Sequence, residues 1–228
     1  MADACAAYWD EQAESFDHQP DHGLRDPDVR SAWAELLLPL LPAASRVVDL
    51  GTGTGSLAVP LAQAGHRVTG ADVAPRMIGV ARRKAAAANV PVGFVIDDAA
   101  APPIRPGAAD AVVVRHLLRT TRSSGRRDRP VARSAAAGRL VLVEGLWSTG
   151  AGLAAATTVQ LVREHDAETT LVPLSDSRLW GGPISDERYL LIARTMQGRG
   201  NGPSGHGSCT SRSNVRRPIS LSRGLDST

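Results

Sequence analysis

Val47-Val48-Asp49-Leu50-Gly51-Thr52-Gly53-Thr54-Gly55 is the most informative stretch of this 228-residue sequence. A short apolar run leads into three glycines at alternate positions, and residues 57–64 then have the apolar spacing of a helix. Glycine tolerates positive φ and has no side chain, so the backbone can turn tightly and approach a ligand closely. A helix that begins directly after such a turn directs its free N–H groups toward the same ligand. The stretch therefore predicts a strand, a binding loop and a helix in succession.

Apolar strand-like runs alternate with helical segments from residue 46 onward. Helices are expected at residues 57–64 and 75–89. Strands are expected at residues 46–50, 66–71, 92–96, 109–115, 139–144, 169–173 and 188–194. Apolar strands separated by helices indicate a parallel sheet covered on both faces, and the last two strands are expected to form an antiparallel edge. The sequence thus predicts a doubly wound α/β fold whose seven-stranded sheet is mostly parallel.

The two ends of the chain differ from this central part. Residues 3–24 carry apolar and aromatic residues at helical spacing, and Asp26-Pro27 is expected to begin a second helix, because aspartate caps helices well and proline fits the first turn. The end of the chain is rich in Gly, Ser, Arg and Pro and has no aromatic residue, which is typical of disorder. The expected parts are an N-terminal helical cap at 1–42, a Rossmann-like domain at 43–195 and a disordered tail at 196–228.

Residues 119–139 interrupt the alternation. A helix is expected between the fourth and fifth strands, yet this segment holds seven arginines together with glycine and proline, and it has no apolar periodicity. We hypothesise that this atypical segment and the tail arise from locally shifted reading frames. Re-sequencing the encoding DNA tests the hypothesis, and an in-frame apolar helix without compensating insertions or deletions contradicts it.

Composition excludes several classes of protein. The apolar share is 43%, but no apolar run reaches the roughly 20 residues of a membrane span. The two cysteines lie near opposite ends, and the start of the chain lacks a secretory pattern, so a reducing cytoplasm is expected. The net charge of +3 reflects arginines concentrated in residues 119–139 and the tail, without interleaved aromatic residues. Neither a membrane nor a nucleic acid is therefore an expected partner, and the oligomeric state is not indicated.

Two carboxylates accompany the glycine loop. Asp72 ends the second strand, 23 residues after Asp49, at the position from which a carboxylate accepts hydrogen bonds from ribose hydroxyls. A nicotinamide dinucleotide fingerprint has the spacing G-x-G-x-x-G, and Ser56 stands where its third glycine belongs. Asp49 would also repel a pyrophosphate, whereas it would attract an amino or sulfonium group. The loop therefore favours a ligand with a cationic end over a dinucleotide.

With these residues in place, the sequence resembles the class I, Rossmann-like S-adenosylmethionine-dependent methyltransferases, especially small-molecule enzymes of the actinomycete type. The resemblance rests on the D-x-G-x-G-x-G motif at residues 49–55, on Asp72, and on Tyr8-Trp9…Phe16-Asp17, which is similar to the start of many cap helices in the family. It covers roughly residues 7–118 and 140–195. It implies S-adenosyl-L-methionine as cofactor and in-line methyl transfer to the O- or N-nucleophile of a small molecule.

The resemblance also implies roles for individual residues. Asp49 would lie near the amino group of the methionine part, Asp72 would bind the ribose diol, and Asp98 would accept from the adenine amino group. Val73 and Met77 would flank the adenine. The cofactor-binding residues implied are Asp49, Gly51, Thr52, Gly53, Gly55, Asp72, Val73, Met77, Asp98, Ala99 and Arg115.

His116 and His22 are candidate general bases, because imidazole titrates in the useful pH range. Tyr8 and Phe16 are candidate contacts of the acceptor. No cluster of residues has the sequence spacing of metal ligands, so no metal is expected. By analogy with the family, residues 144–152 and 179–182 are further places where the acceptor is expected to bind.

Less specific interpretations stay open. Asp98 also suits a helix cap, Met77 suits a core position, and the Tyr8 and Phe16 stripe suits the packing of a lid helix. The chain as a whole also fits a degenerate homologue that binds the cofactor without catalysis, because of its atypical segment. A nicotinamide-dependent oxidoreductase fits less well, since the phosphate-binding spacing is absent.

Overall fold

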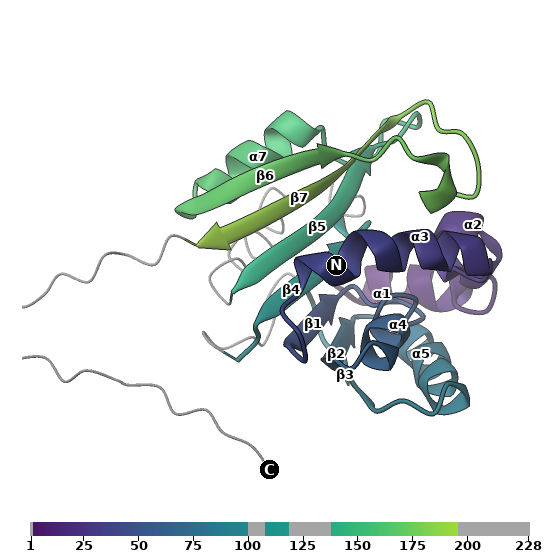
Figure 1. The fold of residues 1–228 in the computed structure, drawn as a ribbon. Helices are drawn as coiled ribbons and strands as arrows, with labels where there is room; N and C mark the ends of the chain where they lie inside the picture. The colour runs from purple at the N-terminus through teal and green to yellow at the C-terminus, as the bar shows by residue number, and fades with distance from the viewer. Residues whose placement is uncertain (1, 100–107, 119–137, 196–228) are drawn as a thin grey trace, which may run out of the picture. The chain divides into compact units, whose positions relative to one another are not determined.

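Seven β-strands form a single sheet in the order β3-β2-β1-β4-β5-β7-β6 within the residues that the computed structural model describes, which are 2–99, 108–118 and 138–195 (Figure 1). The strands are β1 (Arg46–Leu50), β2 (Arg67–Asp72), β3 (Val92–Ile96), β4 (Ala111–Arg115), β5 (Arg139–Leu146), β6 (Ala167–Pro173) and β7 (Glu187–Thr195). The predicted α/β fold and its seven-stranded sheet are confirmed, and each strand lies within a few residues of its predicted range.

The sheet is parallel from β3 to β5, and β7 runs against its neighbours. The strand order reverses next to β1, so the carboxyl ends of β1 and β4 border a crevice that is typical of ligand sites in such sheets. The antiparallel edge is confirmed, with one refinement. The edge strand is β6, whereas β7, the last strand in the chain, is inserted between β5 and β6. β5 extends past Glu144 because its last residues pair with the start of β7.

Helices precede and connect the strands. They are α1 (Ala2–Gln12), α2 (Pro20–Gly23), α3 (Pro27–Leu37), α4 (Ala58–Gln63), α5 (Pro75–Ala87) and α7 (Ala155–Arg163), with 3-10 turns η1 (Phe16–His18), η2 (Leu38–Leu40) and η5 (Ser177–Leu179). The helical spacing at residues 3–24 predicts one helical segment, and this prediction is wrong in detail, because the chain turns at Phe16–His18 before α2. The predicted start of α3 is right, since the Asp26 carboxylate accepts hydrogen bonds from the backbone N–H groups of Asp28 and Val29.

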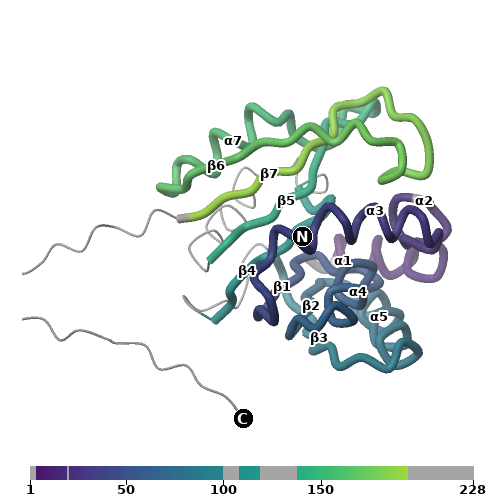
Figure 2. Tube along the Cα trace, in the orientation of Figure 1, coloured from purple at the N-terminus to yellow at the C-terminus, as the bar shows by residue number. Residues whose placement is uncertain are grey.

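Apolar side chains pack on both faces of the sheet. On one face, α3 and α4 bury Trp33 and Leu61 against Val113 of the central strand β4 and its neighbours. On the other face, α7 buries Val162 against strand residues that include Leu142. Figures 1 and 2 show α7 on one side of the sheet, with α1 to α5 gathered on the other. The sheet therefore has the two-sided cover that its apolar strands predicted.

Two predicted segments fall outside the described residues. They are the atypical segment at 119–139, except for its last two residues, and the tail at 196–228. In the part of the chain that is described, no helix combines the length and the apolar character needed to cross a membrane.

Candidate functional site

The three glycines after β1 form a tight loop at the carboxyl end of the sheet. Gly51, Gly53 and Gly55 have φ values of 69°, 52° and 76°, all in the region that favours glycine. The backbone N–H of Gly51 donates to the carbonyl oxygen of Ala71 at 2.8 Å, which ties the loop to the end of β2. The sequence prediction of a glycine-dependent turn between a strand and a helix is therefore confirmed in its backbone conformation.

Asp72 ends β2 beside this loop. One of its carboxylate oxygens accepts from the backbone N–H of Gly53 at 2.9 Å, and the other accepts from the N–H of Ala74 at 2.9 Å. Burial raises the pKa of Asp72, and the two N–H donors oppose that shift by stabilising the ionised form. Each oxygen of an ionised carboxylate has further acceptor capacity. Asp72 is therefore held rigidly while it can still accept hydrogen bonds from a ligand.

Asp49 lies near the end of β1, just before the loop, with 2% of its surface exposed. Its carboxylate accepts a hydrogen bond from the Thr52 hydroxyl at 2.6 Å. Burial raises the pKa of Asp49 to about 6, against the opposing effects of the Thr52 hydrogen bond and the positive charge of Arg115. A buried carboxylate that is costly to ionise is stabilised when a cation arrives. Thr52, which the resemblance implied as a cofactor contact, orients this carboxylate.

Arg115 at the end of β4 connects the sheet to the cap. Its guanidinium donates to the backbone carbonyl oxygens of Asp21 at 2.7 Å and His22 at 2.6 Å, and it stacks over the Trp33 ring at 5.2 Å. Burial lowers the pKa of Arg115 to about 10, so the side chain stays charged at neutral pH. Arg115 therefore fixes the backbone of α2 at the carboxyl end of the sheet and places positive charge near Asp49.

The segment after α1 is docked on the glycine loop. The Asp17 carboxylate accepts from the Thr54 hydroxyl at 2.5 Å and forms an ion pair with Lys84 of α5 at 2.7 Å. Burial lowers the pKa of Lys84, and the Asp17 carboxylate opposes that shift. The Phe16 ring lies 3.6 Å from the position that a Cβ on Gly53 would occupy. The cap therefore covers the loop through an aromatic ring and a largely buried ion pair.

The residues expected to flank an adenine lie along the ends of β2 and β3. Met77 is 1% exposed and packs with Ala13 and Ala74 in a small cluster beneath the cap. The N–H of Asp97 donates to the carbonyl oxygen of Asp72 at 3.0 Å, so the residue before Asp98 is bonded to the end of β2. Two of the other implied residues, Val73 and Ala99, are partly buried. Met77 therefore occupies a core position, and the contacts of Val73, Asp98 and Ala99 with an adenine stay predictions.

His22 and His116 meet although 93 residues separate them in the chain. Their ring centroids are 6.4 Å apart. Phe16 stacks on His22 at 4.5 Å, and Trp180 stacks on His116 at 5.9 Å while Trp147 meets it edge-on at 5.1 Å. Both tryptophans lie in the ranges that analogy singled out for the acceptor. The two histidines therefore lie among aromatic rings, next to the end of β4.

Tyr8 lies apart from these histidines. Its side chain is 57% exposed, and its ring contacts Trp9, which in turn contacts Phe16. The aromatic stripe of the cap is therefore a continuous row, with Phe16 at its inner end and Tyr8 at its outer end.

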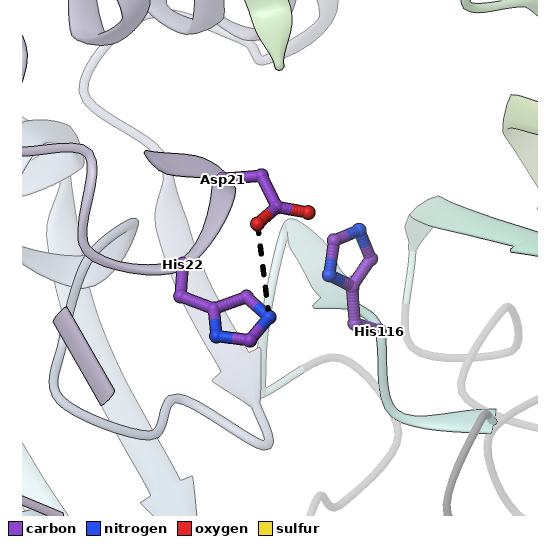
Figure 3. Close-up of side chains that lie close together, drawn as sticks. All are labelled: Asp21, His22 and His116. Atoms are coloured by element: carbon purple, nitrogen blue, oxygen red, sulfur yellow. Dashed lines mark ion pairs between the residues drawn. The ribbon is translucent and has the colours of Figure 1, made fainter. Parts of the chain in front are cut away.

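Sequence reasoning missed three contributors to this site. Asp21 lies with its carboxylate close to both histidine rings (Figure 3). Lys84 anchors the cap, and Gly70 of β2 lets the Thr52 hydroxyl approach, since a Cβ there would lie 2.8 Å from it. No spacing pattern links these residues to their partners, because each contact joins segments that are distant in sequence.

Comparisons with known proteins agree with this geometry. A family model described as a methyltransferase domain matches residues 47–133. The demethylmenaquinone methyltransferase of Thermus thermophilus is 45% identical over 89 residues, which are 38% of this chain and 40% of that protein. A ubiquinone biosynthesis O-methyltransferase of Xanthomonas campestris is 32% identical over 114 residues, which are 49% of this chain and 44% of that protein. The chain thus spans about two fifths of the length of these curated relatives.

Solved structures share the fold. A TehB-like S-adenosylmethionine-dependent methyltransferase from Corynebacterium glutamicum superposes with a TM-score of 0.58 at 18% identity, over 86% of this chain and 98% of that one. The magnesium protoporphyrin IX methyltransferase of Synechocystis, solved with bound S-adenosylmethionine, has a TM-score of 0.57 at 24% identity, over 73% of this chain and 78% of that one. These structures show that the chain shares the Rossmann-like fold, and the family-model match shows that residues 47–133 are similar to a methyltransferase domain.

Proposed function

We propose that this protein binds S-adenosyl-L-methionine at the carboxyl ends of β1 and β2 and transfers its methyl group to a small-molecule acceptor. The observation that carries the proposal is the pairing of the Asp72 carboxylate with the N–H of Gly53, inside a loop whose three glycines all have positive φ. That arrangement places one fixed carboxylate at the end of β2 and a second, buried carboxylate, Asp49, on β1 just before the loop.

The donor set fits this cofactor. Asp49 would accept from the amino group of the methionine part, and its burial makes a cation the suitable neighbour. Asp72 would accept hydrogen bonds from the ribose hydroxyls, because its carboxylate oxygens have further lone pairs beyond those bonded to the two backbone N–H groups. Val73, just after β2, and Asp98, just after β3, would contact the adenine, with Met77 supporting them from within the core. The three loop glycines leave room for close approach of the ligand to the backbone.

S-adenosylmethionine supplies, when bound, a methyl group and its own leaving group on a positively charged sulfur. The protein must orient the acceptor in line with the methyl group and exclude water from it. The new bond joins the acceptor oxygen or nitrogen to the methyl carbon, while the electron pair of the broken carbon–sulfur bond stays on sulfur. For a hydroxyl acceptor, the imidazole of His116 or His22 takes up the proton, and an amine acceptor has less need of a base.

The aromatic residues around the histidines favour a planar acceptor. Phe16, Trp147 and Trp180 surround His22 and His116 within stacking distance. The relative from Thermus thermophilus is named as a demethylmenaquinone methyltransferase and that from Xanthomonas campestris as a ubiquinone biosynthesis O-methyltransferase, and both names agree with a ring-containing acceptor. We therefore place small phenols first among the candidate acceptors, ahead of amines and carboxylates.

A non-catalytic homologue is the alternative, because the fold alone does not determine methyl transfer. A solved [4+2]-cyclase has this fold, with a TM-score of 0.59 at 20% identity, so the fold also occurs in a protein that is not named for methyl transfer. Incubation of the full chain with S-adenosylmethionine and a panel of small phenols, amines and carboxylates, read by mass spectrometry, separates the two. The proposal expects one acceptor class to gain a methyl group while S-adenosylhomocysteine accumulates. Binding of S-adenosylhomocysteine without methylation of any acceptor would favour the alternative.

A further inference from the structure

The side chains of Asp21, His22 and His116 converge at the end of β4, on the acceptor side of the proposed cofactor site (Figure 3). One ligand-type atom from each residue lies within 4.8 Å of the other two, and the His22 Nε2 to Asp21 Oδ1 distance is 3.8 Å. All three residues are partly buried. We propose that these residues form a binding site for one divalent transition-metal ion of the zinc type.

The donor set matches the chemistry of such an ion. Two imidazoles and one carboxylate are a common three-ligand set for catalytic zinc and related ions, with a further coordination position open to water or substrate. In a tetrahedral site, two ligand atoms that each lie about 2.1 Å from the ion are about 3.4 Å apart. The widest separation allowed by the observed cluster therefore needs to contract by up to about 1.4 Å when the ion binds.

The surroundings hold the three side chains in place. Arg115 fixes the backbone of Asp21 and His22 through both carbonyl oxygens. The second oxygen of Asp21, Oδ2, pairs with Arg188 at 3.4 Å, and Asp186 balances the charge of Arg188 at 2.8 Å. Outer partners of this kind orient ligands and are themselves important for metal affinity. The positive charges of Arg115 and Arg188 near the cluster are thus balanced by the carboxylates of Asp186 and Asp49 as well as by that of Asp21.

His116 has a backbone conformation that is unusual for its residue type. Its φ of 58° lies in the left-handed region, and its N–H donates to the carbonyl oxygen of Val143 at 3.0 Å. This conformation turns the chain at the end of β4, and the imidazole faces His22 and Asp21 (Figure 3). Backbone strain in a non-glycine residue is concentrated at functional sites, because the surrounding structure must maintain it.

The ion would deepen the proposed function, and this part of the inference rests on that function. An acceptor hydroxyl that binds at the open position would lose its proton to solvent at a lower pH, because a divalent cation stabilises the oxyanion. His22 and His116 would then act as neutral ligands and need not accept the proton themselves. Acceptors with two neighbouring oxygens, such as catechol-type rings, are the class best suited to such a site.

The test is a titration of the untagged, chelator-treated full chain with Co²⁺, followed by visible absorption. Co²⁺ is the probe because its d–d bands report the geometry and ligands of a site that takes zinc. We expect one equivalent to bind and to produce these bands, and Zn²⁺ to displace it. His22→Phe keeps a ring against Phe16, and His116→Asn suits a left-handed backbone. Each should weaken Co²⁺ binding at least about tenfold.

His18→Ala is the matched control, since His18 is exposed on the neighbouring turn outside the cluster, and it should bind Co²⁺ like the parent chain. Titration of every variant with S-adenosylhomocysteine, without metal, checks that the cofactor site is folded. Absence of the bands in the parent chain, or equal Co²⁺ affinity in His22→Phe and the parent chain, overturns the metal site. If Co²⁺ binds but S-adenosylhomocysteine does not, the metal site stands and the proposed methyl transfer fails.

Discussion

The Asp72 carboxylate at the end of β2 accepts a hydrogen bond from the backbone N–H of Gly53 at 2.9 Å, so the acidic strand end and the glycine loop form one unit. The same carboxylate accepts from Ala74 on its other oxygen. The loop conformation and the position of the carboxylate therefore depend on each other. This coupling links the backbone turn to the group proposed to hold the ribose.

Asp72→Asn should weaken S-adenosylhomocysteine binding about 10- to 100-fold, because a charge-assisted hydrogen bond contributes about 1.5–3 kcal/mol. The asparagine NH₂ group must also face one of the two backbone N–H donors, of Gly53 or Ala74. Calorimetric titration measures the change. Asp110→Asn is the control, since Asp110 lies just before the amino end of β4, at the opposite ends of the strands from the loop, and pairs with Arg46 on the surface. Equal loss of affinity in both variants would show that Asp72 has no specific role.

The affinity for S-adenosylhomocysteine should depend on pH through Asp49. Its pKa of about 6 means that the carboxylate is ionised above pH 6 and neutral below it. Only the ionised form attracts an ammonium group, so affinity should fall about tenfold per pH unit below 6 and stay constant from pH 7 to 8. Titrations from pH 5 to 8 measure this profile. Asp49→Asn should bind weakly at every pH, and a profile in the parent chain without a break near pH 6 contradicts the assignment.

The same raised pKa has a consequence for stability without ligand. Asp49 ionises at about pH 4 in the unfolded chain and at about pH 6 in the folded chain, so the folded chain binds its proton more tightly. The contribution of this residue to stability is therefore present below pH 4 and is lost as the pH rises from 4 to 6. Comparison of urea midpoints for the parent chain and Asp49→Asn across this window isolates the contribution, and parallel curves would contradict it.

Lys84→Met should lower the free energy of unfolding by about 1.5–3 kcal/mol, because it leaves the Asp17 carboxylate largely buried without its cation. The side chains of Lys84 and Asp17 are 28% and 11% exposed. Arg83→Met is the matched control on the same helix. It removes a pair with Glu14 whose side chains are 63% and 69% exposed, and it should cost less than about 1 kcal/mol. Urea denaturation measures both, and similar costs would show that the cap is not anchored by Lys84.

Gly70→Ala should destabilise the protein by about 1–3 kcal/mol, because the added methyl group overpacks the interior. Its Cβ would lie 2.8 Å from the Thr52 hydroxyl oxygen and 2.9 Å from the Phe94 ring, and displacing Thr52 disturbs its hydrogen bond to Asp49. Gly93→Ala in the neighbouring strand is the control. A Cβ there would meet nothing nearer than 3.5 Å, so the stability should change by less than about 0.5 kcal/mol. Thermal unfolding of both variants compares them, and a larger loss for Gly93→Ala contradicts the packing described.

The parts of the fold that local patterns determine were predictable from sequence. The apolar runs predicted each strand, and the glycine spacing predicted the conformation of the loop at residues 51–55. Helix α7 was missed because its nine residues include four β-branched ones and its N-cap position is Ala154, so no capping residue marks its start. The insertion of β7 between β5 and β6 was also missed, since pairing between distant strands leaves no local signal.

The residues of the candidate site likewise include some that the sequence predicted and some that it did not. Asp49 and Asp72 follow from their positions relative to the glycines, because a parallel sheet brings neighbouring strand ends together. The contacts of Asp17 with Lys84 and of His22 with His116 depend on how the cap docks, and 66 and 93 residues lie between these partners in the chain. Side-chain packing sets that docking, so residue spacing alone did not predict it.

Parallel calorimetric titrations of the full chain with S-adenosylhomocysteine and with NADH decide whether the glycine loop binds a methionine-type cofactor or a dinucleotide. We predict that S-adenosylhomocysteine binds at one site per chain, that Asp72→Asn weakens this binding, and that NADH produces no binding heat. Binding of NADH, or the absence of any S-adenosylhomocysteine binding to the folded chain, would contradict this prediction.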